Sequence, residues 1–173
     1  MNHTILDQQH REFWGGLAHE MKPEFWFTFN YVRPYNDRTS LEGFKFVTKA
    51  MQRKIPSRRT IRGMACLERT WKNAHFEGCL HMHSLLCGVD ASFRNPDAYI
   101  TDLAYKSVLL LTDWKGRPMA DTDTIDIQRV YEPERVIKYA TKDLNRSDIQ
   151  RKTKICLIRP DGLDVTFANI NLN

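Results

Sequence analysis

Two apolar, strand-like segments stand close together in the middle of the chain, and they limit the fold more than any other feature. They cover about residues 60–71 and 78–89, and a polar turn through Lys72 and Asn73 joins them. Strands joined by so short a connection pair antiparallel, because parallel strands need a crossover of a dozen residues or more. The chain is therefore expected to build its core on an antiparallel sheet.

The remaining segments alternate between patterns typical of strands and patterns typical of helices. The run at residues 25–31 is aromatic and β-favouring, and residues 123–130 alternate apolar with polar side chains. No internal repeat or long linker divides the chain. Helices are predicted at about residues 6–21, 37–55, 96–112 and 133–145, and further strand candidates lie at 154–158 and 165–168.

Apolar residues of the two central helices recur at helical spacing, which predicts that one side of each helix packs on the sheet. Antiparallel strands with helices on one face predict an α+β sandwich of the ferredoxin or RRM-like type. The apolar positions are Leu41, Phe44, Phe46, Val47 and Met51 in the first helix, and Tyr99, Leu103, Val108, Leu109 and Leu110 in the second.

Length and composition predict one soluble domain spanning residues 1–173, with 42% hydrophobic and 27% charged residues. No segment approaches the ~18 apolar residues of a membrane helix, and the polar start of the chain is unlike a secretory signal. A cytoplasmic protein is expected. A net charge of +5 favours a polyanionic partner such as nucleic acid. Without disulfide-like spacing, reduced and mostly buried thiols are expected at Cys66, Cys79, Cys87 and Cys156.

The triplet His81-Met82-His83 lies inside the second of the two apolar strands. Residues two apart in a strand point to the same face, so both imidazoles should project side by side while Met82 turns into the opposite layer. Two neighbouring neutral imidazoles form a good half of a site for a divalent metal. The alternative is a pair of histidines on a half-exposed sheet face.

Glu68 on the preceding strand is a candidate third ligand. If the two strands pair as a hairpin, Glu68 falls opposite His81 or His83, and cross-strand partners share a face. The alternative makes Glu68 a surface partner of Arg69 or Lys72.

A carboxylate beside two imidazoles is a mixed oxygen and nitrogen donor set suited to Mg²⁺ or Mn²⁺, with positions open to substrate oxygens. Glu77, in the predicted turn, is a rival third ligand. Cys79 shares the histidines' face and can recruit Zn²⁺, although a buried thiol is its simpler role.

Tyr139 and Lys142 stand three apart on the predicted helix that begins near Pro133, so they share one face. A phenol ordinarily has a pKa near ~10 and needs a nearby metal or ammonium to attack a phosphate at neutral pH. Taken alone, this pair is also explained by an amphipathic helix in which the tyrosine is incidental.

Together these motifs resemble the HUH endonucleases, specifically the rolling-circle replication initiator (Rep) group. The strand Phe27-Thr28-Phe29-Asn30 is similar to the first motif of that family, and His81-Met82-His83 to the second. Tyr139-Ala140-Thr141-Lys142 is similar to the third. All three stand in family order, and the resemblance covers roughly residues 24–145.

The resemblance implies a five-stranded antiparallel sheet and a metal, Mn²⁺ or Mg²⁺, bound by His81, His83 and Glu68. It implies that Tyr139 cleaves single-stranded DNA at a specific nick site or origin and keeps the 5′ phosphate as a phosphotyrosine, with Lys142 orienting the phosphate. A single catalytic tyrosine is similar to the single-tyrosine Rep type. The chain has no P-loop pattern, so a separate helicase partner is expected. A plasmid, phage or competing mobile element fits as the target, and an origin in a eukaryotic virus would place the protein in the host nucleus.

Basic side chains supply the candidates for contact with DNA phosphates. The alternative for such a run is a solvated face. The candidates are Arg53, Lys54, Arg58, Arg59 and Arg62 in one dense stretch, with Arg33, Arg69 and Lys72 nearer the inferred site.

Three other functions compete with a nickase. A non-catalytic RRM-like binder would use Phe25, Phe27 and Phe29 as a base-stacking platform and leave the histidines structural. A Y1-type transposase would share the tyrosine chemistry. A small zinc hydrolase would use Cys79 but lacks a convincing general base.

Overall fold

The computed structural model describes residues 12–13, 15–55, 60–69, 78–88, 95–140, 154–158 and 165–167. Residues 15–20 are helical, within the helix predicted near the N-terminus. The other elements, in chain order, are β1 (Phe25–Tyr31), α2 (Asp37–Gln52), β2 (Arg62–Arg69), β3 (Leu80–Cys87), α3 (Pro96–Leu109), β4 (Ala120–Arg129), α4 (Pro133–Ala140), β5 (Lys154–Ile158) and β6 (Val165–Phe167).

One antiparallel sheet organises the described residues, in the strand order β4-β1-β3-β2-β5-β6. Its first four strands and the two helices between them follow the order strand, helix, strand, strand, helix, strand, which is compatible with the ferredoxin-like α+β class. The expectation of five strands is wrong, since β5 and the three-residue β6 extend the sheet to six. The α+β class is confirmed.

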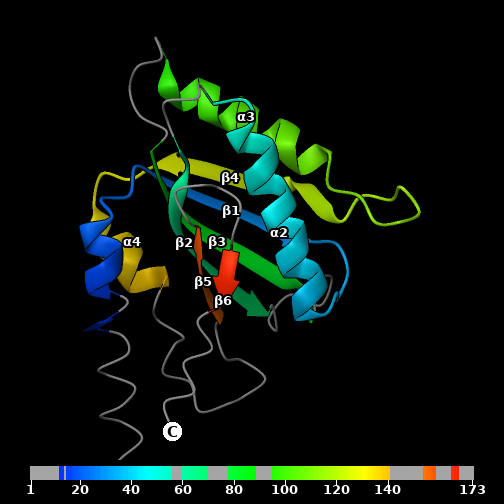
Figure 1. Ribbon diagram of the computed structural model, residues 1–173, viewed down its shortest axis with the longest axis horizontal. Helices are drawn as coiled ribbons and strands as arrows, with labels where there is room; N and C mark the ends of the chain where they lie inside the picture. The colour runs from blue at the N-terminus through cyan, green and yellow to red at the C-terminus, as the bar shows by residue number, and fades with distance from the viewer. Residues whose placement is uncertain are drawn as a thin grey trace, which may run out of the picture.

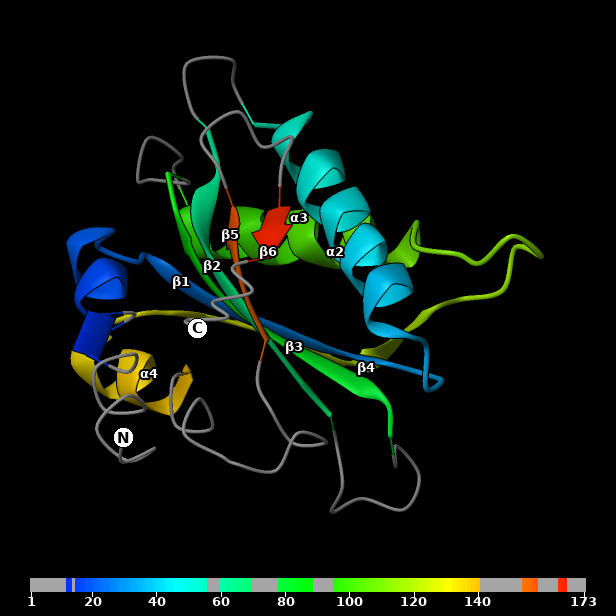
Figure 2. The ribbon, with the colours of Figure 1, turned by 60° about the horizontal axis from the view of Figure 1, so that its bottom comes forward.

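The first face of the sheet carries the large hydrophobic core. The alternation of β1 turns Phe25, Phe27 and Phe29 to this side, where each is at most 1% exposed. They pack with side chains of α2 and α3, among them Phe44 and Val108. Figure 2 shows both helices lying on this side of the sheet.

Helix α2 begins where the sequence offers a cap. The Asn36 side chain accepts a hydrogen bond from the backbone N–H of Thr39 at 2.8 Å, which satisfies one donor of the first turn. Of the apolar positions predicted for this helix, Leu41, Phe44 and Val47 are buried, whereas Phe46 is 43% exposed. The prediction that Phe46 packs in the core is therefore wrong.

Helix α3 is capped in the same way, by Asn95, and has a proline in its first turn. The predicted core positions Leu103 and Val108 are buried. The assignments of Leu109 and Leu110 to the core are wrong, because the helix ends there and both side chains are about half exposed or more, at 49% and 62%.

The second face of the sheet carries a smaller apolar cluster. Met64, Cys66 and Leu85 project from β2 and β3 and pack with Ile137 and Ala140 of α4. Figure 2 shows α4 and the N-terminal helix together on this side, opposite α2 and α3. The expectation that helices cover only one face is thus wrong: short helices also cover part of the other. No helix in the described part of the chain has the length and apolar character needed to cross a membrane.

Candidate functional site

The second face brings the predicted site residues of β2 and β3 together through strand register. Glu68 pairs with His81 and Cys66 pairs with His83 across the two strands. The predicted hairpin register, with Glu68 opposite one of the histidines, is therefore confirmed. Met82 points to the first face and is completely buried in the large core, as strand alternation predicted.

Glu68, His81 and His83 form a compact group. The Oε2 atom of Glu68 lies 3.8 Å from Nε2 of His83, and the centroids of the two imidazole rings lie 4.2 Å apart. Only 16% of the Glu68 side chain and 6% of the His83 side chain are exposed. A carboxylate and two imidazoles thus share one partly buried place on the sheet.

Tyr139 reaches this group from a different element. Its ring stands edge-on to the His83 ring with the centroids 5.5 Å apart, and 48% of the residue is exposed. Ile137 and Ala140 of the same helix are buried against the sheet, so packing of α4 sets the position of the tyrosine. A half-exposed phenol beside an imidazole is accessible to a substrate and still held at the site.

Trp26 completes the surroundings of His83. The two rings stack with centroids 4.8 Å apart and planes inclined by 26°, and the Tyr139 ring meets the indole edge-on at 5.8 Å. Sequence reasoning missed this residue. The signal was available, because Trp26 alternates with Phe25 and Phe27 and so belongs to the histidines' face.

The donor set of the group suits a divalent cation in part. Two atoms 3.8 Å apart, as in Glu68 and His83, can both lie about 2.1 Å from one ion. Within the described residues, however, no three His, Cys, Asp or Glu side chains stand arranged as a metal-binding group. The residues fit the predicted ligand chemistry, and two of the three donors are already within range of a common ion.

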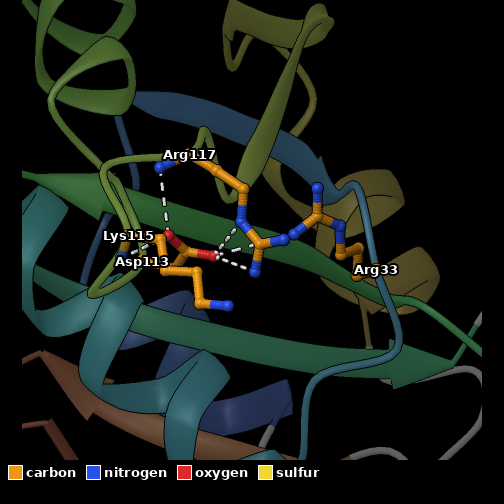
Figure 3. Close-up of polar contacts among 4 residues, drawn as sticks. All are labelled: Arg33, Asp113, Lys115 and Arg117. Carbon is orange, nitrogen blue, oxygen red and sulfur yellow. Dashed lines mark hydrogen bonds and ion pairs between the residues drawn. The ribbon is translucent and has the colours of Figure 1, made fainter.

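A second polar cluster holds the turn between α3 and β4. The Asp113 carboxylate accepts hydrogen bonds from the backbone N–H groups of Lys115 and Arg117 and from Nε of Arg117, and Arg33 lies 3.6 Å away (Figure 3). Its bonds with Arg117 lower the pKa of Asp113 to about 2. The carboxylate therefore fixes the turn and two guanidinium groups beside it.

This turn also carries an exposed aromatic ring that the sequence reading did not single out. Trp114 is 87% exposed, and the Lys115 ammonium lies 4.6 Å from the centre of its ring. In Figures 1 and 2 the segment between α3 and β4 extends beyond the sheet.

The structure separates the basic residues predicted to bind DNA. Arg33 follows β1 at the end of the sheet where His81 lies, since Asn30 pairs with His81. Arg53 and Lys54 are exposed at the end of α2, which covers the opposite face. Arg62 is exposed on β2, six residues from Glu68 or roughly 20 Å along the strand. Arg69 lies next to Glu68 on β2 and pairs with Leu80, so the described backbone brings Arg33 and Arg69 to the histidines' end of the sheet.

Several predicted residues lie outside the described part of the chain. They are Lys142, Arg58, Arg59, Lys72, the rival ligand Glu77, and the side chains of Arg69 and Cys156.

The base-stacking platform predicted for an RRM-like binder is not available. Phe25, Phe27 and Phe29 are at most 1% exposed beneath α2 and α3. On the second face, the aromatic rings beside His83 are instead those of Trp26 and Tyr139.

The three cysteines whose side chains are described are buried, reduced thiols, as predicted: Cys66, Cys79 and Cys87. Burial raises the pKa of the Cys87 thiol, which donates to the backbone carbonyl of Arg62. These thiols behave as small core side chains.

A comparison of the chain with family models, curated proteins and solved structures finds no match.

Proposed function

We propose that this protein is a metal-dependent, site-specific endonuclease that nicks single-stranded DNA, with Tyr139 as its nucleophile. The observation that carries the proposal is the meeting of Tyr139 with His83. A helix and a strand far apart in the sequence place the two rings 5.5 Å apart, beside Glu68 and His81. The motif resemblance implies that the tyrosine and the histidines lie together, whereas the core packing of α4 alone does not require this.

The fold supports the same proposal at a coarser level. The HUH endonuclease fold is built on an antiparallel ferredoxin-like sheet, and the order β4-β1-β3-β2 is compatible with that class. The histidines stand on a central strand, and the tyrosine stands on a helix against the same face.

In the proposed reaction the Tyr139 oxygen attacks the scissile phosphorus in line with the leaving group. The phenol loses its proton, the phosphorus bond to the 3′ oxygen breaks, and that oxygen gains a proton as a free 3′-hydroxyl. The 5′ phosphate remains joined to Tyr139. Because this ester replaces the broken phosphodiester, a 3′-hydroxyl can attack it in turn, so the enzyme also transfers and rejoins strands.

Glu68, His81 and His83 would hold Mn²⁺ or Mg²⁺. A bound divalent cation supplies charge stabilisation at the phosphate in the transition state. Glu68 and His83 offer two donors within range of one ion, and His81, whose ring lies 4.2 Å from that of His83, would be the third ligand. Lys142 is proposed to orient the phosphate, and a separate helicase would supply longer single-stranded substrate.

The test is a covalent-adduct assay with Mn²⁺ and single-stranded DNA from candidate origins or phage genomes. A label at the 3′ end of the DNA should migrate with the protein in SDS, whereas a label at the 5′ end should leave on a free fragment. Tyr139→Phe should remove the adduct, because it deletes the attacking oxygen and keeps the ring.

Tyr105→Phe is the matched control. Tyr105 is 42% exposed, close to the exposure of Tyr139, but it lies on α3. The proposal fails if wild-type protein forms no adduct with any of these DNAs, or if Tyr139→Phe forms it as readily as Tyr105→Phe.

The main competing function is non-catalytic binding of single-stranded nucleic acid on the second face of the sheet. Tyr139 favours it, with the partly buried Trp26 ring beside it, because aromatic rings open to solvent stack on unpaired bases. Binding without any adduct, at a level insensitive to Tyr139→Phe and Mn²⁺, would select it.

A further inference from the structure

A cleft of about 700 Å³ opens beside Tyr139, on the side toward the end of β4. Trp26 and Tyr139 line one part of it, and both also contact His83. The chain from Arg129 to Glu132 and the outer side of α4 line the rest. The cleft is therefore continuous with the candidate site, and its volume falls in the range of small-molecule sites.

Aromatic rings make the cleft suitable for a flat ligand. Tyr131 is 81% exposed, so most of its side chain is open to solvent. Trp26 and Tyr139 contribute two further rings to the lining. Rings of this kind stack on unpaired nucleobases.

The charge of the lining favours an anion. Arg129, Arg135 and Lys138 stand against one acidic residue, Glu132. Arg129 is already bound to Asp97 at 2.7 Å, and Arg135 lies 3.8 Å from Glu132. No ion pair within the described residues engages the Lys138 ammonium, which leaves it the cation best placed to meet a phosphate.

We infer that this cleft binds the nucleotide next to the scissile phosphate, with its base against Tyr131 and its phosphate at Lys138. The inference rests on the proposed function for the identity of the substrate, and it adds a place where one base of the nick site is recognised. A single-stranded nucleotide fits these requirements, because a base held in a duplex cannot turn its face to Tyr131.

Binding measurements test the cleft apart from catalysis. Fluorescence anisotropy with a short single-stranded oligonucleotide, in EDTA, reports affinity without cleavage. Tyr131→Ala should weaken binding about 5- to 150-fold, the loss expected for one stacked base. Its effect on binding of the same sequence as a duplex should be negligible.

Lys138→Ala should act differently, because it removes a charge and no ring. The slope of log affinity against log salt should fall by about 0.7–1, the value for one phosphate contact. Tyr105→Ala and Lys49→Ala, on α3 and α2, are matched controls and should change neither quantity.

The possible results separate the two proposals. Weaker single-strand binding in Tyr131→Ala, with a lower salt slope in Lys138→Ala, supports the cleft even where no covalent adduct forms. An adduct with unchanged affinity and salt slope in both variants overturns the cleft and leaves the nickase standing. Equal losses in the two control variants would also overturn it.

Discussion

The two faces of the sheet are built from the same strands but from different kinds of side chain. On the first face, Phe27 and Met82 are completely buried in a large apolar core under α2 and α3. On the second face, the neighbouring residues Trp26 and His83 lie among polar, ionisable and half-exposed groups. Because side chains alternate along a strand, one segment can pack every other residue into the core and place ionisable side chains on the other face with the residues between them.

The difference shows where each face is sensitive to change. The first face depends on close packing, which loses several kcal/mol when a large side chain is removed. The second face has a smaller core, made by Met64, Leu85 and Ile137. Around His83 it holds ionisable side chains that are largely withdrawn from water, such as that of Glu68. Stability and the proposed activity should thus respond to different substitutions.

The largest expected effect comes from neighbouring residues of β1. Phe27→Ala should lower the free energy of unfolding by about 3–5 kcal/mol, because it leaves a cavity in the main core. Thr28→Ala, on the histidines' face, should lower it by less than about 1 kcal/mol. Urea unfolding followed by circular dichroism measures both. Equal losses would break the distinction between the faces.

A smaller effect is expected at the candidate metal site. Glu68→Gln keeps the shape of the side chain and removes its charge, so affinity for Mn²⁺ should fall about 10- to 100-fold. Stability measured in EDTA should hardly change. Titration calorimetry reads the affinity, and Glu42→Gln on α2 is the control. Unchanged Mn²⁺ affinity in Glu68→Gln would remove this residue from the ligand set.

The smallest effect should come from the turn at Asp113, which belongs to neither face. The pKa of Asp113 is lowered from 3.8 to about 2, so its ionised form is favoured in the folded state. The resulting stabilisation should be present above about pH 4 and be lost as the pH falls through about 2.

Asp113→Asn should therefore be slightly less stable than wild type at pH 7 and equal to it near pH 2. Unfolding curves at several pH values check this. A difference that persists at pH 2 would mean that geometry, and not the charge of Asp113, holds the turn.

Local periodicity predicted much of the fold and part of the site. The orientation of Met82 away from the two histidines follows from strand alternation, and the placement of Glu68 opposite one of the histidines follows from antiparallel pairing of the two strands. The wrong core predictions concern apolar residues at the end of a helix, or apolar residues that do not lie on the buried side of their helix. Leu110 lies at the end of α3, and Phe46 lies off the stripe of Phe44 and Val47.

The rest of the site depends on tertiary packing that no local pattern contains. The contact of Tyr139 with His83 requires α4 to lie on one particular face of the sheet. Periodicity shows that this helix has a buried side but does not say what it is buried against. The cleft beside Tyr131 has the same origin, since a strand end and a helix form it together.

The alternation of β3 has a consequence for how this chain can vary. Side-chain direction along the strand repeats every two residues, and this one repeat sets both which residues enter the core and which face carries the histidines. Adding or deleting one residue within the strand would turn His81 and His83 into the core and Met82 toward the open side. Substitutions can therefore alter either face separately, but a single-residue change in length would destroy both at once.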